Sequence, residues 1–146
     1  MKILIQRVSK ANVTVDEKEV AAVGRGYLIL AGIEKGDTPA AAEYLAKKTA
    51  NLRIFEDENG KMNLSVTDVG GEILVVSQFT LAGDTSRGNR PGFETAARPE
   101  EARPLYEYFA QCLETYGLTV KKGIFQADMQ VGLINDGPVT FMLERR

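Results

Sequence analysis

Apolar residues in this chain form short runs bounded by glycine or charged residues, a pattern typical of buried or half-buried strands. The clearest run covers residues 73–81, where four consecutive aliphatic residues follow a glycine pair and polar side chains then appear. Residues 11–15 alternate apolar and polar side chains instead, as expected for a strand with one buried face. On this basis we expect strands at residues 2–9, 11–15, 19–23, 27–33, 53–55, 62–65, 73–81, 118–120, 123–133 and 139–143.

Two segments are predicted to be helical. The first has Asp37 or Thr38 as its N-cap, with Pro39 just inside, and extends to about residue 52. The second has Pro104 in its first turn, ends at Gly117 and carries six apolar residues at helical spacing. These are Leu105, Tyr108, Phe109, Cys112, Leu113 and Tyr116. Hairpins combined with helical crossovers predict the α/β class: a single β-rich domain with mixed sheets and two main helices packed on one side.

The composition narrows the possible chemistry. The chain has 146 residues, enough for one domain with its own core, and a single cysteine, Cys112, which rules out an internal disulfide. It has no histidine, so a Ser-His-Asp or Cys-His apparatus and the usual zinc sites are impossible. No apolar run approaches the ~20 residues of a membrane span, and we expect a cytoplasmic protein with no membrane or DNA partner, no metal and no cofactor. The net charge of −2 gives no global basic field, which counts mildly against an RNA partner.

The polar end of the run at residues 73–81 is the first candidate site. Ser77, Gln78 and Thr80 can simply satisfy local backbone groups at a strand end. Alternatively, they line a pocket, and two kinds of chemistry are then open. Thr80 could act as a nucleophile, although no histidine exists to activate it. The backbone N–H groups of Ser77 to Phe79 could instead bind a developing oxyanion, and this alternative is favoured because it needs no titratable side chain.

The second candidate site is the stretch Asn135-Asp136-Gly137-Pro138. Spacing alone favours a tight turn with a trans proline at the start of the following strand. The alternative is a cis bond that aims backbone carbonyls into a pocket, although only about 5–6% of X-Pro bonds are cis.

Other polar and aromatic residues leave two interpretations open. Arg87 and Arg90, together with Lys121 and Lys122, could contact phosphates, but such residues are more often a solvated surface. Phe125 and Met129 lie four residues apart in a β-rich region; they favour core packing, with stacking against a nucleic-acid base as the alternative.

Taken together, the two candidate stretches resemble the D-aminoacyl-tRNA deacylase family, also called D-tyrosyl-tRNA deacylase. The resemblance is carried by the motifs Ser77-Gln78-Phe79-Thr80-Leu81 and Asn135-Asp136-Gly137-Pro138-Val139-Thr140, and it covers essentially the whole chain. Its other segments are Ile5-Gln6-Arg7-Val8, Asn51-Leu52-Arg53-Ile54-Phe55, Lys61-Met62-Asn63-Leu64-Ser65 and Ala127-Asp128-Met129-Gln130-Val131.

The resemblance implies a fold with a barrel-like core and an ester hydrolase as the activity. The substrate would be D-aminoacyl-tRNA, and also glycine mischarged on tRNA, so that neither enters translation. It further implies a homodimer in which Gly137-Pro138 of one subunit enters the active site of the other as a cis bond and excludes L-amino acids. The tRNA 2′-hydroxyl would assist the attack of water.

The resemblance also implies roles for individual residues. The amides of Ser77 and Phe79 would face the scissile carbonyl, with the side chains of Gln78 and Thr80 shaping the pocket. Chiral selectivity would rest on Gly137, Pro138 and Arg7, the last of which would hold the Gly-Pro segment in place. The substrate-binding residues would be Phe125 and Met129, near the terminal adenosine, together with Val139 and Thr140.

Two rival functions stay open on the sequence alone. One is a non-catalytic dimer that binds a metabolite or the end of an RNA, because the chain offers few titratable catalytic groups. The other is a related deacylase with relaxed chirality that uses Thr80 as its nucleophile. Turnover separates the first rival from an enzyme, and hydrolysis of L-esters identifies the second.

Overall fold

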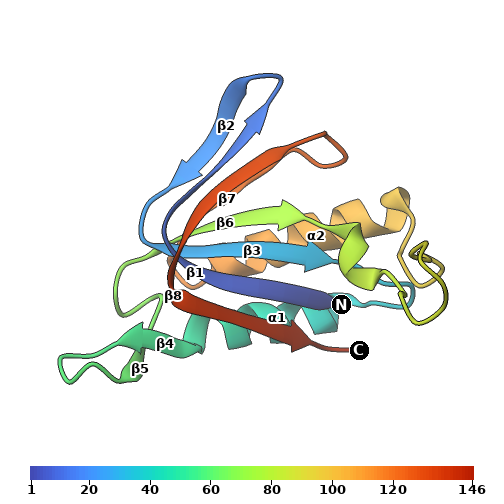
Figure 1. Cartoon of the computed structure of the whole chain (residues 1–146). Helices are drawn as coiled ribbons and strands as arrows, with labels where there is room; N and C mark the ends of the chain where they lie inside the picture. The colour runs from blue at the N-terminus through green and yellow to red at the C-terminus, as the bar shows by residue number, and fades with distance from the viewer.

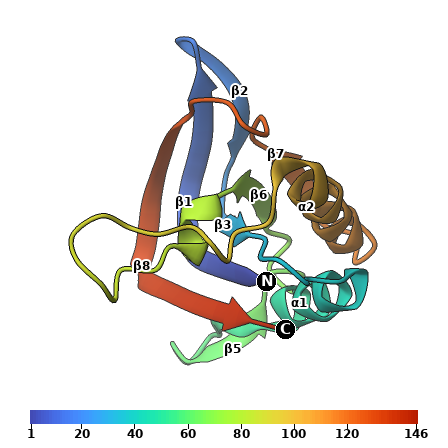
Figure 2. The ribbon, with the colours of Figure 1, turned by 90° about the vertical axis from the view of Figure 1, so that its right-hand side faces the viewer.

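The computed structural model describes residues 1–146 and shows a strongly bent mixed sheet with both main helices on one face (Figures 1 and 2). The elements in chain order are β1 (Lys2–Val15), β2 (Lys18–Val23), β3 (Gly26–Gly32), α1 (Pro39–Asn51), β4 (Arg53–Glu56), β5 (Met62–Ser65), β6 (Glu72–Ser77), the short 3-10 helix η1 (Phe79–Ala82), α2 (Pro99–Glu114), β7 (Thr119–Lys122) and β8 (Gln130–Glu144). The predicted α/β class is confirmed, with the sheet nearly closed into a barrel-like core.

The order of the strands is β2-β1-β3-β6-β7, and β8 pairs with β1 as well. Strand β1 is antiparallel to all three of its neighbours: residues 2–8 pair with β3, residues 11–15 with β2, and residues 2–14 with β8. Strand β6 is parallel to both β3 and β7. Helices α1 and α2 therefore belong to two successive parallel crossovers that advance in the same direction across the sheet. Right-handed crossovers of this kind place both helices on the same face, as Figure 2 shows.

The core has two parts, one on each face of the sheet. The larger part packs between the sheet and the two helices, and the smaller part lies on the opposite face, inside the bend of β1 and β8. The aliphatic run of β6 contributes to both, because alternate side chains point to opposite faces. Ile73 and Val75 belong to the larger part, whereas Leu74 and Val76 belong to the smaller one. The prediction of a strand buried on both faces is confirmed.

Both helices form, but the predicted start of the second was wrong. In α1 the hydroxyl of Thr38 caps the helix by accepting a hydrogen bond from the Ala41 amide at 3.3 Å, as predicted. Helix α2 begins at Pro99, so Pro104 lies inside the helix and not in its first turn. Pro104 deprives the carbonyl of Glu100 of its partner, and this loss is tolerated because Glu100 is exposed to water.

Three predicted strand boundaries also differ from the structure. Residues 2–15 form one continuous strand instead of two. The strand predicted at residues 73–81 ends at Ser77, and η1 follows it. At the C-terminal end, residues 123–129 are not a strand, whereas β8 continues through the Gly-Pro stretch that spacing had assigned to a turn. The pairing of β8 with β1 explains this continuity, because local turn preferences yield to a long antiparallel ladder.

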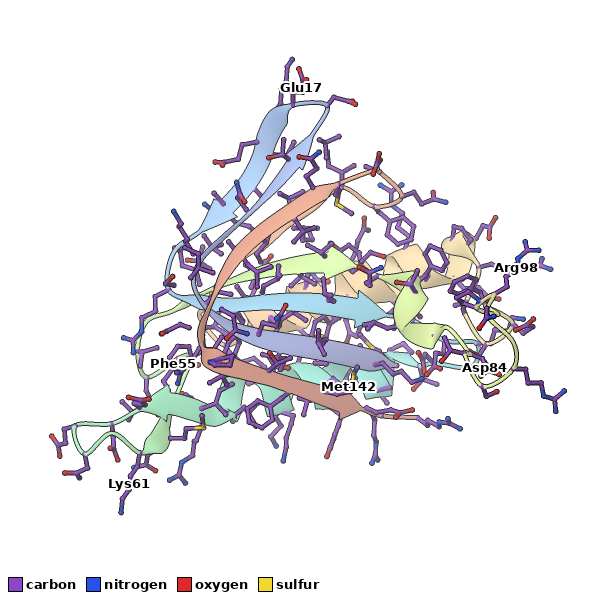
Figure 3. The ribbon with its side chains drawn as sticks, viewed as in Figure 1. Glu17, Phe55, Lys61, Asp84, Arg98 and Met142 are labelled. Atoms are coloured by element: carbon purple, nitrogen blue, oxygen red, sulfur yellow. The ribbon has the colours of Figure 1, made fainter.

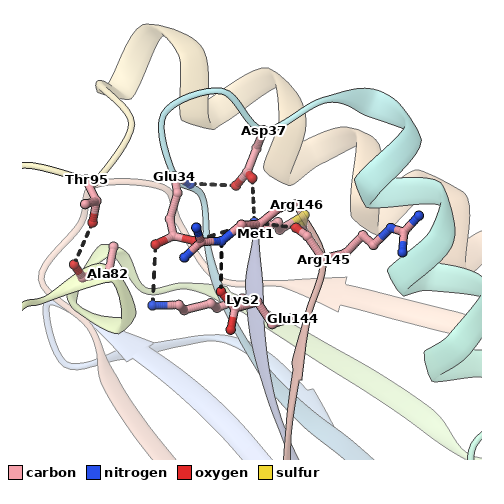
Figure 4. A network of polar contacts seen from close by, with 9 residues as sticks. All are labelled: Met1, Lys2, Glu34, Asp37, Ala82, Thr95, Glu144, Arg145 and Arg146. Atoms are coloured by element: carbon pink, nitrogen blue, oxygen red, sulfur yellow. Dashed lines mark hydrogen bonds and ion pairs between the residues drawn. The ribbon is translucent and has the colours of Figure 1, made fainter.

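The amino terminus is buried in a polar network (Figure 4). The ammonium group of Met1 donates hydrogen bonds to a carboxylate oxygen of Asp37 and to the carbonyl of Arg145, the latter at 2.8 Å. A carboxylate oxygen of Glu34 lies 3.6 Å from the same nitrogen. This network joins the start of β1, the segment between β3 and α1, and the end of β8. None of the helices is long and apolar enough to cross a bilayer.

Candidate active site

A pocket of about 600 Å³ lies at the carboxyl end of β6. Its walls come from the end of β6 and η1, from the start of α2, and from the segment before β8. The lining residues are Ile33, Val76, Ser77, Gln78, Phe79, Ala97, Pro99, Ala102, Phe125, Gln126, Ala127, Asp128, Met129 and Val131. The pocket therefore brings together Ser77, Gln78 and Phe79 with Phe125 and Met129, which the sequence had left as separate candidates.

The pocket exists because β7 is shorter than β6. The last residue of β7, Lys122, pairs with Val75, two residues before Ser77. Beyond this point β6 has no strand on that side, and the segment from Phe125 to Met129 lines the space instead. Carboxyl ends of parallel strands are the usual place for ligand sites in α/β sheets.

The carbonyl of Val75 fixes the strand where the pocket begins. It accepts hydrogen bonds from the Gly123 amide at 3.0 Å and from the hydroxyl of Tyr106 at 2.9 Å. Burial raises the pKa of Tyr106, so its hydroxyl keeps the proton that it donates. The sequence did not identify Tyr106 as a core residue, whereas Tyr116, predicted to be on the inner face, lies beyond the end of α2 and is exposed.

Backbone amides are the main polar groups that the end of β6 directs toward the pocket. The Gln78 amide is already used, because it donates to the Ala31 carbonyl of β3 at 2.8 Å. Successive N–H groups of a strand point in opposite directions, so the Ser77 amide points away from β3, toward the side where β7 has ended. Phe79 opens η1, and the first amides of a helix have no acceptor within it. The arrangement offers two N–H donors at the pocket, Ser77 and Phe79.

Side chains at this end of the pocket carry little acid–base chemistry. The amide nitrogen of Gln78 donates to the hydroxyl of Thr80, and Thr80 itself is exposed and does not line the pocket. Asp128 is the only ionisable side chain among the lining residues, and it is exposed. No group of three or more acidic or cysteine side chains is placed to hold a metal ion.

Phe125 and Met129 contribute apolar side chains to the wall of the pocket. The Phe125 ring is half-buried and packs against Tyr106 with 5.8 Å between ring centroids. Met129 is also half-buried and packs against Gly123, where an added Cβ would lie 2.7 Å from the methionine sulfur. Each side chain thus keeps part of its surface open to the pocket while packing on the body of the protein.

The Gly137-Pro138 bond is cis, against the trans turn that spacing favoured and as the resemblance implied. It lies in β8 where the pairing with β1 slips: Asn135 is opposite Val8 and Thr140 is opposite Gln6. The extra residues of β8 form a bulge facing Arg7, and Gly137 and Pro138 are both exposed. Neither lines the pocket of its own chain.

Arg7 anchors this bulge by hydrogen bonds from its buried side chain. Its side chain is buried, and its Nε donates to the carbonyl of Asp136 at 2.8 Å while Nη1 donates to the carbonyl of Ile54 at 2.7 Å. Nη2 lies 3.9 Å from the carboxylate of Glu56. The guanidinium therefore fixes the residue before Gly137 to the β4 strand.

The side chain of Asn135 forms hydrogen bonds across the bulge. Its side-chain oxygen accepts from the amide of Val139 at 2.7 Å, and its side-chain nitrogen donates to the Thr140 hydroxyl at 3.0 Å. Val139 is buried in the larger part of the core, and Thr140 is exposed beside Asn135. The structure thus places Val139 and Thr140 with the bulge and outside the lining of the pocket.

Comparison with known proteins identifies the family of this chain. A family model described as "D-Tyr-tRNA(Tyr) deacylase" matches residues 4–144. The chain belongs to the D-aminoacyl-tRNA deacylase family. Among curated relatives, the D-aminoacyl-tRNA deacylase of Geotalea uraniireducens is 62% identical, covering 99% of this chain and 93% of the relative. That of Geobacter sulfurreducens is 58% identical, covering 100% and 96%.

Solved structures share the fold of this deacylase family member. A structure of "c-Myc DNA Unwinding Element Binding Protein" superposes with a TM-score of 0.94 at 45% identity and covers 100% of this chain and 99% of its own. A "probable eukaryotic D-amino acid tRNA deacylase" gives a TM-score of 0.82 at 17% identity, covering 97% of each chain. The second likeness concerns the fold alone.

Several residues that line the pocket were not singled out from the sequence. Ile33, Ala97, Pro99 and Ala102 come from three separate segments and are unremarkable apolar residues. Only the length of β7 relative to β6 creates the space that they surround, and sequence patterns give strand lengths to within a few residues at best.

Proposed function

We propose that this chain hydrolyses the ester bond of D-aminoacyl-tRNA, and of glycine mischarged on tRNA, by backbone-based oxyanion stabilisation. Membership of the family makes the chain an ester hydrolase that acts on D-aminoacyl-tRNA. The observation that carries the finer proposal is the character of the pocket, which offers two backbone donors and a single exposed carboxylate. Such a site suits a labile ester, for which positioning and charge stabilisation supply much of the catalysis.

In the proposed reaction, the ester carbonyl oxygen accepts hydrogen bonds from the amides of Ser77 and Phe79. A water oxygen attacks the carbonyl carbon, and the negative charge that develops on the carbonyl oxygen is stabilised by these two donors. The bond to the ribose oxygen then breaks, and that oxygen leaves as a hydroxyl after taking up a proton. The products are the free amino acid and tRNA.

The attacking water must lose a proton and the leaving ribose oxygen must gain one, and we assign this relay to the tRNA: its 2′-hydroxyl accepts the proton of the water and gives its own proton to the leaving oxygen. The terminal ribose carries a 2′-hydroxyl next to the ester, a group that only an RNA substrate supplies. Phe125 and Met129 form an apolar wall suited to hold the terminal adenine by stacking and contact. This arrangement would place the 2′-hydroxyl and the ester together at the two amides.

Chirality is assigned to Gly137 and Pro138 of a partner subunit. In one chain they are exposed and lie outside the pocket, so they can act on a pocket only in a second copy. Ser77 pairs with Ala31, which pairs with Ile3, whereas the bulge faces Arg7. The two features are thus separated by β3 and β1 and by four residues along β1, about 13 Å at the usual rise. A cross-subunit arrangement would let the carbonyls of the Gly-Pro segment exclude an L side chain.

The strand that carries the bulge has the properties of an interface. β8 pairs with β1 on one side and has no strand on the other. Ile134, Phe141 and Met142 on β8 are large apolar residues with 39–50% of their surface exposed. Exposed apolar side chains on an unpaired edge strand suit pairing with a second chain. We therefore propose a homodimer that covers β8.

The sharpest test of the oxyanion assignment is Phe79→Pro compared with Phe79→Ala. Proline removes the amide hydrogen but fits the first position of a helix, and Gln78 before it, at φ −143° and ψ 83°, lies outside the α region that a following proline disfavours. Both variants lose the exposed ring. We expect Phe79→Pro to lower kcat on D-tyrosyl-tRNA by a further factor of about 100 to 1,000 relative to Phe79→Ala. Equal rates for the two variants would contradict the assignment.

The chiral filter is tested with D-tyrosyl-tRNA and L-tyrosyl-tRNA at low enzyme concentration. The wild type should turn over the D-ester many times and leave the L-ester at its spontaneous rate. In Gly137→Ala an added Cβ would lie 2.6 Å from the Val139 amide nitrogen, so the bulge must move. A displacement of about 1 Å can cost 100-fold in rate, and we expect a loss of that order on the D-ester. The matched control Gly24→Ala, whose Cβ meets only a side-chain oxygen at 3.5 Å, should behave as wild type.

Complementation between inactive variants tests the cross-subunit geometry. Phe79→Pro chains keep the bulge, and Gly137→Ala chains keep the amides of the pocket. When the two are unfolded together and refolded as mixed dimers, the pocket of the second should receive an intact bulge from the first. Half of the dimers should be mixed, and each mixed dimer has one complete site out of two. Recovery of up to about one quarter of wild-type activity would therefore fit the proposal. If mixed dimers form without recovered activity, the bulge acts within its own chain.

Two further variants separate this mechanism from its rivals. Thr80→Ala should retain most of the activity, because the Thr80 hydroxyl lies outside the pocket and its partner is a neutral amide. Loss of activity with a trapped acyl-enzyme in the wild type would point to Thr80 as a nucleophile. Asp128→Asn should also stay active. A strong loss of activity would instead indicate that the carboxylate of Asp128, and not the 2′-hydroxyl, accepts the proton of the water. Stoichiometric binding without turnover would favour the non-catalytic rival.

A further inference from the structure

The segment at residues 83–98, between η1 and α2, is attached by hydrogen bonds beside the pocket. Asp84 and Gly92 exchange backbone hydrogen bonds of 2.8 and 2.9 Å, which closes the tip of the segment into a loop. The hydroxyl of Thr95 donates to the Ala82 carbonyl at 3.0 Å (Figure 4), and the Ala97 amide donates to the Ile33 carbonyl at 3.0 Å. Although it has almost no regular secondary structure, this segment is attached to the body of the protein at both ends.

The same segment is joined to the mouth of the pocket. Phe93 packs edge-on against Phe79, with 5.1 Å between the ring centroids, and Phe79 lines the pocket. At the other end, Ala97 and Pro99 flank Arg98 and also line the pocket. Figure 3 places Arg98 and Asp84 at the same end of the molecule, beyond the carboxyl end of β6.

This segment holds all the arginines that have no partner within the chain. Arg87, Arg90 and Arg98 are exposed and make no ion pair, side-chain hydrogen bond or aromatic contact. Every arginine elsewhere is engaged by a carboxylate, a carbonyl or amide oxygen, or an aromatic ring: Arg7, Arg25, Arg53, Arg103, Arg145 and Arg146. The free guanidinium groups are therefore confined to the segment that joins η1 to α2 and borders the pocket at both ends.

The lysines that the sequence grouped with these arginines behave differently. Lys121 donates to the Ala22 carbonyl at 2.7 Å, and Lys122 lines a surface hollow that also contains Glu107 and Glu114. Within the segment, the carboxylate of Asp84 accepts from the Ser86 amide at 2.9 Å, and Glu94 lies against Gly92. The arginines thus outnumber the acids of the segment.

We propose that Arg87, Arg90 and Arg98 bind backbone phosphates of the tRNA acceptor end and hold its 3′ terminus at the pocket. This inference rests on the proposed function, because the esterified ribose must reach the amides of Ser77 and Phe79. Guanidinium groups bind phosphates through paired hydrogen bonds, and such contacts position a nucleic acid without reading its sequence. Arg90 is three residues from Phe93, so the two residues lie within about 11 Å of each other along the chain. This distance corresponds to about three successive phosphates of one nucleic-acid strand.

The proposal explains how a chain with a net charge of −2 can recognise an RNA. No global basic field is needed when the free guanidinium groups are concentrated in one segment next to the pocket. It also separates two roles: the pocket recognises the aminoacyl-adenosine, and the arginines recognise the phosphates upstream of it. The contribution of the arginines should therefore vanish on a substrate that has no phosphates.

The test compares the triple variant Arg87→Gln, Arg90→Gln, Arg98→Gln with the charge-matched control Lys47→Gln, Lys48→Gln, Lys61→Gln. The control lysines are also exposed and unpaired, but they lie on α1 and at the β4–β5 turn. Substrates are D-tyrosyl-tRNA, at several salt concentrations, and 3′-O-D-tyrosyl-adenosine. Loss of three phosphate contacts should lower the slope of log kcat/KM against log salt by about 2 to 3. At low salt we expect kcat/KM on the tRNA to fall by about 10- to 100-fold relative to the control, through KM.

The nucleoside ester decides how a loss is interpreted. The arginine variant should hydrolyse 3′-O-D-tyrosyl-adenosine as fast as the wild type, and its melting temperature should be unchanged. Equal losses on both substrates, or equal effects of the arginine and lysine variants, would overturn the proposal. The proposal would also be overturned if duplex DNA competed as strongly as tRNA without an amino acid. The three arginines would then form a general nucleic-acid surface. If the wild type hydrolysed neither ester yet bound tRNA through these arginines, the proposed function would fail, whereas the contacts of the arginines with tRNA phosphates would stand.

Discussion

Replacing Arg7 by methionine should destabilise the protein and loosen the bulge that carries Gly137. Arg7 is the only fully charged side chain among the buried residues, and it donates to the carbonyls of Asp136 and Ile54 at 2.8 and 2.7 Å. Methionine fills much of the same volume but offers no donor. Both carbonyls would then lose a charged partner, and the carbonyl of Ile54 belongs to a residue with only 4% of its surface exposed.

The size of the effect follows from these contacts. A hydrogen bond to a charged group contributes about 1.5–3 kcal/mol to the free energy of unfolding, so the two bonds amount to about 3–6 kcal/mol. The ion pair with Glu56 adds little, because the atoms are 3.9 Å apart and the glutamate side chain is 59% exposed. Removing a buried cation relieves some desolvation cost. We expect a net loss of about 3 kcal/mol.

Urea unfolding followed by far-UV circular dichroism measures this loss. Protein concentration must be the same for all variants, because association would shift the midpoint. The control is Arg53→Met, since Arg53 is exposed and bonds to Asn63 at the surface; its loss should stay below about 1 kcal/mol. On D- and L-tyrosyl-tRNA, Arg7→Met should discriminate less than the control does. A loss for Arg7→Met no larger than that of the control, with an unchanged urea slope, would refute the role given to the buried guanidinium.

Three further changes test other parts of the fold by thermal unfolding. Gly26→Ala should lower the free energy of unfolding by about 3 kcal/mol or more, because φ at Gly26 is +156° and an added Cβ would lie 1.8 Å from the Glu72 carbonyl oxygen. A loss below about 1 kcal/mol would show that β6 can move away from the added methyl group. Asp37→Asn should cost about 3 kcal/mol, since it leaves the buried Met1 ammonium without its nearest charge (Figure 4); wild-type stability would mean that Glu34 suffices. Backbone amides of Lys61 and Asn59 lower the pKa of Asp57 from 3.8, so its stabilisation is present above that value and is lost as the pH falls through the lowered pKa. Asp57→Ala should therefore melt below the wild type at pH 7 and together with it at about pH 2, and a difference that persists in acid would contradict this cause.

The fold could be predicted where local signals and burial agree. The aliphatic run at residues 73–76 is a strand buried on both faces, and Thr38 with Pro39 starts a helix as its sequence indicates. Predictions failed where two local signals competed, or where a long-range contact overrode a local preference. Pro104 looked like a helix start, but Pro99 occupies that position and α2 continues past the second proline. The Gly-Pro stretch looked like a turn, but pairing with β1 keeps it within β8.

The site could be predicted only in parts, because its parts belong to different elements. Ser77 and Phe79 were identified from an unusual polar strand end, and Phe125 and Met129 from their spacing of four residues in a β-rich region. Their meeting in one pocket depends on β7 ending opposite Val75, which no local pattern specifies.

The largest gap between sequence and structure concerns the two motifs themselves. They resemble the family only as a pair, and yet one chain keeps them apart: Ser77 lines the pocket, and Gly137 faces solvent across β3 and β1. Under the proposed mechanism, which uses both motifs for one reaction, they would meet between two copies, and β8 offers an unpaired, partly apolar edge for such an association. Charges placed on that edge, as in Phe141→Glu, should then abolish chiral deacylation through loss of the dimer, although Phe141 lies outside the pocket. Sedimentation run beside the deacylation assay distinguishes the cases, because a monomeric variant that still discriminates D from L would show that a single chain contains the complete filter.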